Sequence, residues 1–197
     1  MALGDDNINT GQLSPFQKSI NEEDEDGMRG YTRIFTEMSE SYLSLILSHE
    51  EMNQASLVEF VLRCSNIQDK EISGITLHFW YRFVMGLEEL EPFEYRQIKI
   101  DSFAPQLTRL LGICTHLLQY PEGVEDLSPD RLDDIEGIRF YFADTIEDCC
   151  RLLGGEVVLR ATGDPLQEEC RRVASLPLNK QLSDWHGIEA YLYAIQA

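Results

Sequence analysis

Positively charged residues are scarce in this sequence. Lys and Arg together number 16 against 35 Asp and Glu, so the formal net charge is -19 at pH 7 and the isoelectric point is about 4.4. A surface of this sign repels the phosphates of nucleic acids, which argues against direct binding of DNA or RNA. Basic proteins and basic peptides are the partners that its charge favours.

Long apolar segments are also missing. No segment approaches the roughly 18 consecutive apolar residues that a transmembrane helix needs. The first residues, 1–6, lack the basic stretch followed by an apolar run that marks a secretory signal. We therefore expect a soluble protein that does not contact a membrane and carries no export signal.

The cysteines lack the spacing of a disulfide framework or of a zinc site. There are five of them, an odd number, and Cys149 and Cys150 are adjacent. No pair shows the Cys-x-x-Cys spacing typical of zinc ligands. They fall on apolar stripes, so we expect reduced thiols in helix packing and an intracellular protein.

Signatures of catalysis and metal binding are absent as well. The sequence has neither a Gly-rich phosphate loop ending in Lys-Ser or Lys-Thr nor a Gly-x-Ser-x-Gly elbow. The histidines are scattered without metal-ligand spacing: His49, His78, His116 and His186. Asp5, Asn7 and Asn9 superficially resemble a calcium loop, but Thr10 occupies the position that requires Gly and Phe16 the one that requires Glu. We expect no enzyme, no metal and no cofactor.

Apolar residues recur at spacings of three and four from Tyr31 onward, which predicts amphipathic helices. Two residues help to place helix ends: Gly154 and Gly155 are expected as C-terminal caps, and Asp184 as an N-cap. A break is expected near Gly163 and Pro165. The expected helices span about 31–46, 57–67, 72–87, 98–118, 138–153, 156–175 and 185–195, and Phe79, Trp80 and Trp185 are expected in their core.

The spacing between alternate helices indicates a degenerate repeat. Its first step is about 41 residues, within the range of HEAT helix pairs. The fold class is therefore all-α, a right-handed HEAT-repeat solenoid of about three to four helix pairs, open at both ends. Residues 31–197 form this solenoid and residues 1–30 form a disordered or extended acidic tail. Residues 121–137 are expected to be an acidic loop because they combine carboxylates with Pro121, Gly123 and Pro129.

Four blocks of sequence carry a resemblance to a known family. They are RIFTEMSESY at 33–42, EISGITLHFWYRF at 71–83, DDIEGIR at 133–139 and WHGIEAYLYA at 185–194. Together and in this order, they resemble the SR-protein transportin and importin-13-like branch of the importin-β (karyopherin-β) superfamily. The resemblance covers nearly everything after residue 25 and implies that the chain is a central HEAT-repeat portion of a longer receptor.

The resemblance also implies a function. Such a receptor shuttles between nucleus and cytoplasm, contacts nucleoporins, carries SR-rich splicing factors or other basic proteins, and releases them when RanGTP binds. The acidic loop is the candidate contact with a basic partner, through Glu125, Asp126, Asp130, Asp133, Asp134 and Glu136. The alternative is a structural HEAT-repeat scaffold, such as a phosphatase or kinase regulatory subunit, that does not respond to Ran.

Overall fold

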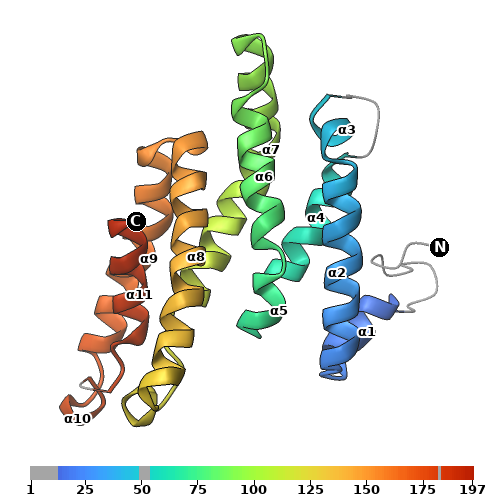
Figure 1. The fold of residues 1–197 in the computed structure, drawn as a ribbon. Coiled ribbons are helices and arrows are strands. Elements are labelled where there is room, and N and C mark those ends of the chain that lie inside the picture. The colour runs from blue at the N-terminus through green and yellow to red at the C-terminus, as the bar shows by residue number, and fades with distance from the viewer. Residues whose placement is uncertain (1–12, 49–53, 182) are drawn as a thin grey trace. The chain divides into compact units, whose positions relative to one another are not determined.

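A computed structural model describes residues 13–48, 54–181 and 183–197, and every regular element in these ranges is a helix (Figure 1). The predicted all-α, HEAT-repeat-type fold class is thereby confirmed. The chain divides into two compact units between Arg82 and Phe83, a boundary that falls within one helix, α6. Within the described residues, no helix is both long enough and apolar enough to cross a membrane.

The first unit contains short and medium helices that begin at well-formed caps. The Ser14 hydroxyl accepts from the Gln17 amide at 3.1 Å, and the Asp24 carboxylate accepts from the Gly27 amide at 3.1 Å. Asp69 caps the helix that follows it in the same way, by accepting from Ile72. The helices are α1 (Pro15–Asn21), α2 (Glu25–Ser41), α3 (Leu43–Ser48), α4 (Gln54–Ser65), α5 (Lys70–Gly74) and the first part of α6 (Leu77–Glu88).

The prediction of a tail over residues 1–30 is wrong for the described part of it. Phe16 is fully buried, and its ring meets that of Phe35 edge-on at 5.5 Å. Arg63 from α4 lies over the same ring at 5.4 Å and donates to Gln17 at 3.0 Å. The acidic run that indicated disorder instead supplies the cap and first-turn charges of α2, where carboxylates are favourable. Residues 1–12 lie outside the described ranges.

The core of the first unit is built on aromatic rings and one buried polar network. Phe35 stacks on Phe60 with ring centroids 5.0 Å apart. Trp80 is fully buried, as expected, and its indole nitrogen donates to the Ser65 hydroxyl at 2.8 Å. Ser65 is also 2.8 Å from the Thr76 hydroxyl, so the one polar atom of the indole is satisfied inside the core.

The second unit contains two long helices and a C-terminal group that packs on them. Helices α8, α9 and α11 lie side by side and each contacts α7 (Figure 1). Phe83 meets Phe103 edge-on at 5.0 Å, and Cys114 and Cys149 are buried in the same unit. Its elements after α6 are α7 (Phe93–Leu117), the 3-10 helix η1 (Val124–Asp126), α8 (Pro129–Leu153), α9 (Gly155–Ala174), α10 (Leu178–Gln181) and α11 (His186–Gln196).

Several predicted boundaries differ from the observed ones. The first expected helix is divided into α2 and α3, and the third into α5 and α6. Helix α9 continues through Gly163 and Pro165, so the expected break is wrong. Gly154 ends α8 with a φ of 82°, as expected for a glycine cap, whereas Gly155 is the first residue of α9. Trp185, not Asp184, occupies the N-cap of α11.

Helix α11 buries small residues rather than the large ones of its expected stripe. Gly187, Ala190 and Ala194 are buried, whereas Leu192 is 54% and Ile195 42% exposed. Small side chains let α11 approach α9 closely, and that contact decides which face turns inward.

Candidate functional site: the acidic surface of α8

The carboxylates predicted to form an acidic loop lie mostly on a helix. Glu125 and Asp126 belong to η1, whereas Asp130, Asp133, Asp134 and Glu136 occupy the first turns of α8. All six are exposed. The prediction of a loop over 121–137 is therefore wrong from Pro129 onward, although the side chains are presented to solvent as expected.

Local sequence explains why α8 begins so early. Pro129 is in the first turn, where its missing amide hydrogen costs nothing and its fixed φ suits a helix. The Ser128 hydroxyl accepts from the Arg131 amide at 3.4 Å as the N-cap. Asp130 adds negative charge at the positive end of the helix dipole. A proline within an acidic stretch thus marks the start of a helix here.

The six carboxylates differ in their contacts. Glu136 accepts a hydrogen bond from the Tyr120 hydroxyl and lies 3.5 Å from an Arg139 nitrogen. Asp134 pairs with Arg131 at 3.9 Å, and both side chains are largely exposed. Glu125, Asp126, Asp130 and Asp133 form no ion pair with any residue in the described ranges. No described residue neutralises the negative charge of these four through an ion pair.

Glu136 belongs to a buried network centred on Arg139, which the sequence analysis did not identify. Arg139 is 1% exposed, and one terminal nitrogen lies 2.6 Å from both carboxylate oxygens of Glu189. The guanidinium carbon is 3.7 Å from the ring centroid of Tyr120 and 4.9 Å from that of Tyr193. Burial, together with the hydrogen bond to Glu136, raises the pKa of Tyr120 to about 12. This network fixes α8 against α11 and the segment after α7.

An exposed aromatic pair continues the acidic surface along α8. Phe140 is 56% and Tyr141 59% exposed, and their rings meet edge-on with centroids 5.9 Å apart. Gly137 lies one turn earlier, and a Cβ atom there would meet nothing within 4 Å. Asp144 lies one turn later, and burial together with the nearby Glu147 carboxylate raises its pKa. The two rings adjoin the apolar stripe of Ile138, Phe142 and Ile146 without belonging to it, so apolar periodicity did not predict them as part of a site.

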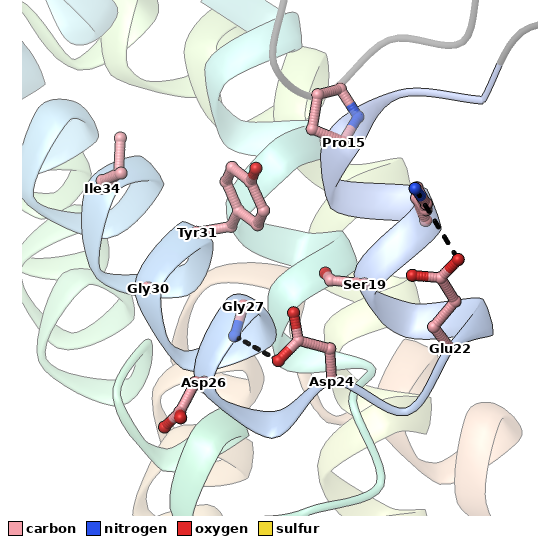
Figure 2. A pocket seen from close by; sticks show the side chains of 10 residues that line it. Pro15, Ser19, Glu22, Asp24, Asp26, Gly27, Gly30, Tyr31 and Ile34 are labelled. Carbon is pink, nitrogen blue, oxygen red and sulfur yellow. Dashed lines mark hydrogen bonds and ion pairs between the residues drawn. The ribbon is translucent and has the colours of Figure 1, made fainter.

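A hollow of about 480 Å³ lies at the corner of α1 and α2 (Figure 2). Three of its polar side chains are already engaged: Asp24 caps α2, and Lys18 pairs with Glu22 at 3.8 Å. A second hollow, of about 460 Å³, is lined by acidic and basic side chains together, among them Glu122, Glu125 and Lys180. Ser183 and Asp184 also line this second hollow, where Ser183 donates to the Lys180 carbonyl at 3.1 Å and Asp184 pairs with Arg172 at 2.7 Å.

No metal centre was found in the described part of the chain. There, no three His, Cys, Asp or Glu side chains gather in a way that could hold an ion. The partial calcium motif at Asp5, Asn7 and Asn9 lies outside the described residues. The candidate site is therefore the exposed surface of α8.

Comparisons with known proteins agree with the resemblance read from the four blocks. Residues 23–116 match the family model described as the Transportin-3/Importin-13 second TPR domain. The chain is 24% identical over 184 residues to Transportin MOS14 of Arabidopsis thaliana, an alignment that covers 88% of this chain and 19% of that protein. It is 28% identical over 179 residues to the mRNA transport regulator MTR10 of Saccharomyces cerevisiae, covering 90% of this chain and 17% of that protein.

The chain thus spans less than a fifth of the length of these curated relatives. The family match begins at residue 23, close to the first residue of α2, so it includes helical sequence that composition alone assigned to a tail. The alignments to the two relatives extend well beyond the family match, over most of the chain. These matches make the chain similar to transportin-like members of the importin-β family.

Proposed function

We propose that this chain is a cargo-docking portion of a nuclear import receptor. The receptor carries SR-rich splicing factors or other basic proteins into the nucleus, moves between nucleus and cytoplasm through contacts with nucleoporins, and releases its cargo when RanGTP binds. The names of the two relatives, a transportin and an mRNA transport regulator, support a transport role. The chain contributes protein-binding surface and no catalysis.

One observation carries the proposal: the unneutralised carboxylates beside and within the start of α8. Glu125, Asp126, Asp130 and Asp133 are exposed and without ion pairs in the described residues, in a chain of net charge -19. A basic segment would gain Coulomb attraction without displacing an existing partner. Each exposed pair is worth about 0 to 1 kcal/mol, so affinity requires several pairs at once.

Binding of a fluorescent alternating Arg-Ser peptide to the whole chain tests the proposal. The variant Asp130→Asn/Asp133→Asn/Asp134→Asn should bind more weakly and with a smaller dependence on salt, since attraction between exposed charges is screened within about 8 Å at physiological ionic strength. Glu136 stays unchanged in this variant because it belongs to the Arg139 network. If Glu136 were neutralised as well, weaker binding could result either from the lost charge or from a disturbed Arg139 network.

The matched control neutralises Asp164, Glu168 and Glu156, which are exposed on α9 and leave the chain with the same net charge. We expect this control to retain most of the affinity. Equal loss in both variants would mean that only total charge matters and that α8 is not the site. Addition of RanGTP to the complex of the full-length receptor with cargo should release the cargo; retention would favour a scaffold that is not linked to Ran.

A further inference from the structure

One face of α8 combines carboxylates with the two exposed rings. Positions that differ by three, four or seven lie on the same side of a helix. By this spacing Asp130, Asp133 and Gly137 share a side with Phe140, Tyr141 and Asp144. We define the α8 face as Asp130, Asp133, Asp134, Gly137, Phe140, Tyr141 and Asp144. All seven of these residues are exposed, whereas Phe142, Ala143 and Ile146 on the other side are buried.

Phe140 and Tyr141 are unusual surface residues for a helix face that is otherwise acidic. Each leaves more than half of its surface in water, at 56% and 59% exposed. The ring faces carry negative potential, so they attract cations, as the adjacent carboxylates do. The rings and the carboxylates of the α8 face therefore select the same chemistry, a cation with a flat apolar surface. Arginine has that chemistry and lysine has only part of it.

Gly137 leaves room for such a side chain between the two groups. A Cβ atom at this position would meet nothing within 4 Å, so the helix surface is bare between Asp133 and Phe140. Along the axis, these two residues are about 10 Å apart at about 1.5 Å per residue. Asp133 and Asp144 are about 16 Å apart by the same rise, which an extended chain covers in about five residues.

We propose that the α8 face docks an extended arginine-rich segment, with one arginine on the Asp133 and Asp134 carboxylates and another across the rings of Phe140 and Tyr141. This inference rests on the proposed function, in which the partner is basic, and names arginine as the residue recognised. Asp144 and Asp130 hold further basic residues at the two ends of the segment. Charge complementarity argues for this occupant, because no described residue neutralises Asp130, Asp133 or Asp144.

The test compares two probes of equal length and charge: a twelve-residue alternating Arg-Ser peptide and its Lys-Ser counterpart. Wild-type chain should bind the arginine peptide more tightly. In the variant Phe140→Ala/Tyr141→Ala, affinity for the arginine peptide should fall about 5- to 25-fold, as expected for two exposed cation–π contacts, and the preference over lysine should disappear. Tyr81→Ala, which removes a 53% exposed ring in the first unit, is the control and should change neither affinity.

A second variant, Gly137→Lys, keeps the rings and places a positive charge in the bare segment. The space there is open, so the helix should still form, and circular dichroism and thermal melting check this for every variant. We expect loss of arginine-peptide binding in Gly137→Lys and retention in Gly137→Ala. A folded Gly137→Lys chain that binds as well as wild type overturns the inference.

Three other outcomes bear on this inference and on the proposed function, and the first of them separates the two. If the arginine peptide binds wild type and the ring variant equally but is lost on neutralisation of Asp130, Asp133 and Asp134, the proposed function stands and the α8 face is wrong. If neither peptide binds wild type, both are overturned. Protection of Phe140 and Tyr141 by RanGTP alone would assign the face to Ran and also overturns the inference.

Discussion

Replacement of Arg139 by Ala should destabilise the second unit strongly. The change removes a guanidinium that is 1% exposed, paired with Glu189 at 2.6 Å and in contact with the rings of Tyr120 and Tyr193. A hydrogen bond to a charged group contributes about 1.5 to 3 kcal/mol, and each cation–π contact adds about 0.5 to 2 kcal/mol. Glu189 is 33% exposed and can regain water, so the loss stays below that of a fully buried pair.

The net expectation is about 3 kcal/mol, equivalent to a fall in Tm of roughly 6 to 12 °C for a chain of this size. Urea unfolding followed by circular dichroism measures the free energy directly. Arg131→Ala is the matched control on the same helix, because that side chain is 70% exposed and 3.9 Å from Asp134. Its loss should cost less than about 1 kcal/mol.

A double-mutant cycle with Glu189→Gln isolates the ion pair from the ring contacts. We expect a coupling energy between positions 139 and 189 of at least about 1 kcal/mol, since the two side chains share one hydrogen-bonded contact. If Arg139→Ala unfolds at the same urea concentration as Arg131→Ala, burial of the guanidinium contributes nothing. The assignment of this network as the fixing point of α11 would then be wrong.

Three further outcomes can be measured on the same chain. Gly137→Ala should raise stability by about 1 kcal/mol, because a helix interior disfavours glycine and the added methyl group meets no atom within 4 Å; no rise in melting temperature would contradict this. Trp80→Ala should cost about 3 to 5 kcal/mol as a large-to-small core change, and a variant that melts like wild type would show that the ring is not packed. Exposed Cys170 should react with a thiol reagent in the folded state, whereas buried Cys64 and Cys149 should not. Burial raises the pKa of both buried thiols to about 12, so near pH 9 only the unfolded state ionises them and the free energy of unfolding should fall as pH rises from 9 towards 12. A flat profile of stability against pH would argue against their burial.

Apolar periodicity predicted the buried face of α7. The stripe of Leu107, Leu110 and Leu111 indicated α7, and these three side chains are fully buried. Trp80 was expected in the core for the same reason. In these segments the residues that become buried are also the apolar ones, so the apolar pattern of the sequence identifies the helix face that packs inward.

Polarity was a poor guide at helix starts. Asp24 and Asp130 belong to acidic stretches with glycine or proline nearby, and composition there indicated a tail and a loop. In the structure, Asp24 caps α2 and Asp130 lies in the first turn of α8. Carboxylates are favourable at the amino end of a helix, so an acidic stretch is compatible with a helix start as well as with a loop.

Long-range polar contacts gave no periodic signal at all. Arg139 and Glu189 are separated by 50 positions, and each alone resembles an ordinary solvated residue on a helix. The acidic positions of the candidate site were predicted from charge, whereas Phe140 and Tyr141 were not. Their exposure depends on how α8 is rotated against α7, which the packing of both helices determines.

The pairing of Ser65 with Trp80 has a consequence for how this fold can diverge among homologues. The indole nitrogen has its partner in the Ser65 hydroxyl at 2.8 Å, inside a core that excludes water. A change of Ser65 alone to alanine leaves that donor without a partner, whereas a joint change with Trp80→Phe removes donor and acceptor together and leaves only the cost of the smaller ring. The constraint runs in one direction: lineages that keep tryptophan at 80 should keep a hydroxyl at 65, whereas Ser65 retains its bonds to the Val61 carbonyl and to Thr76 when the indole is lost.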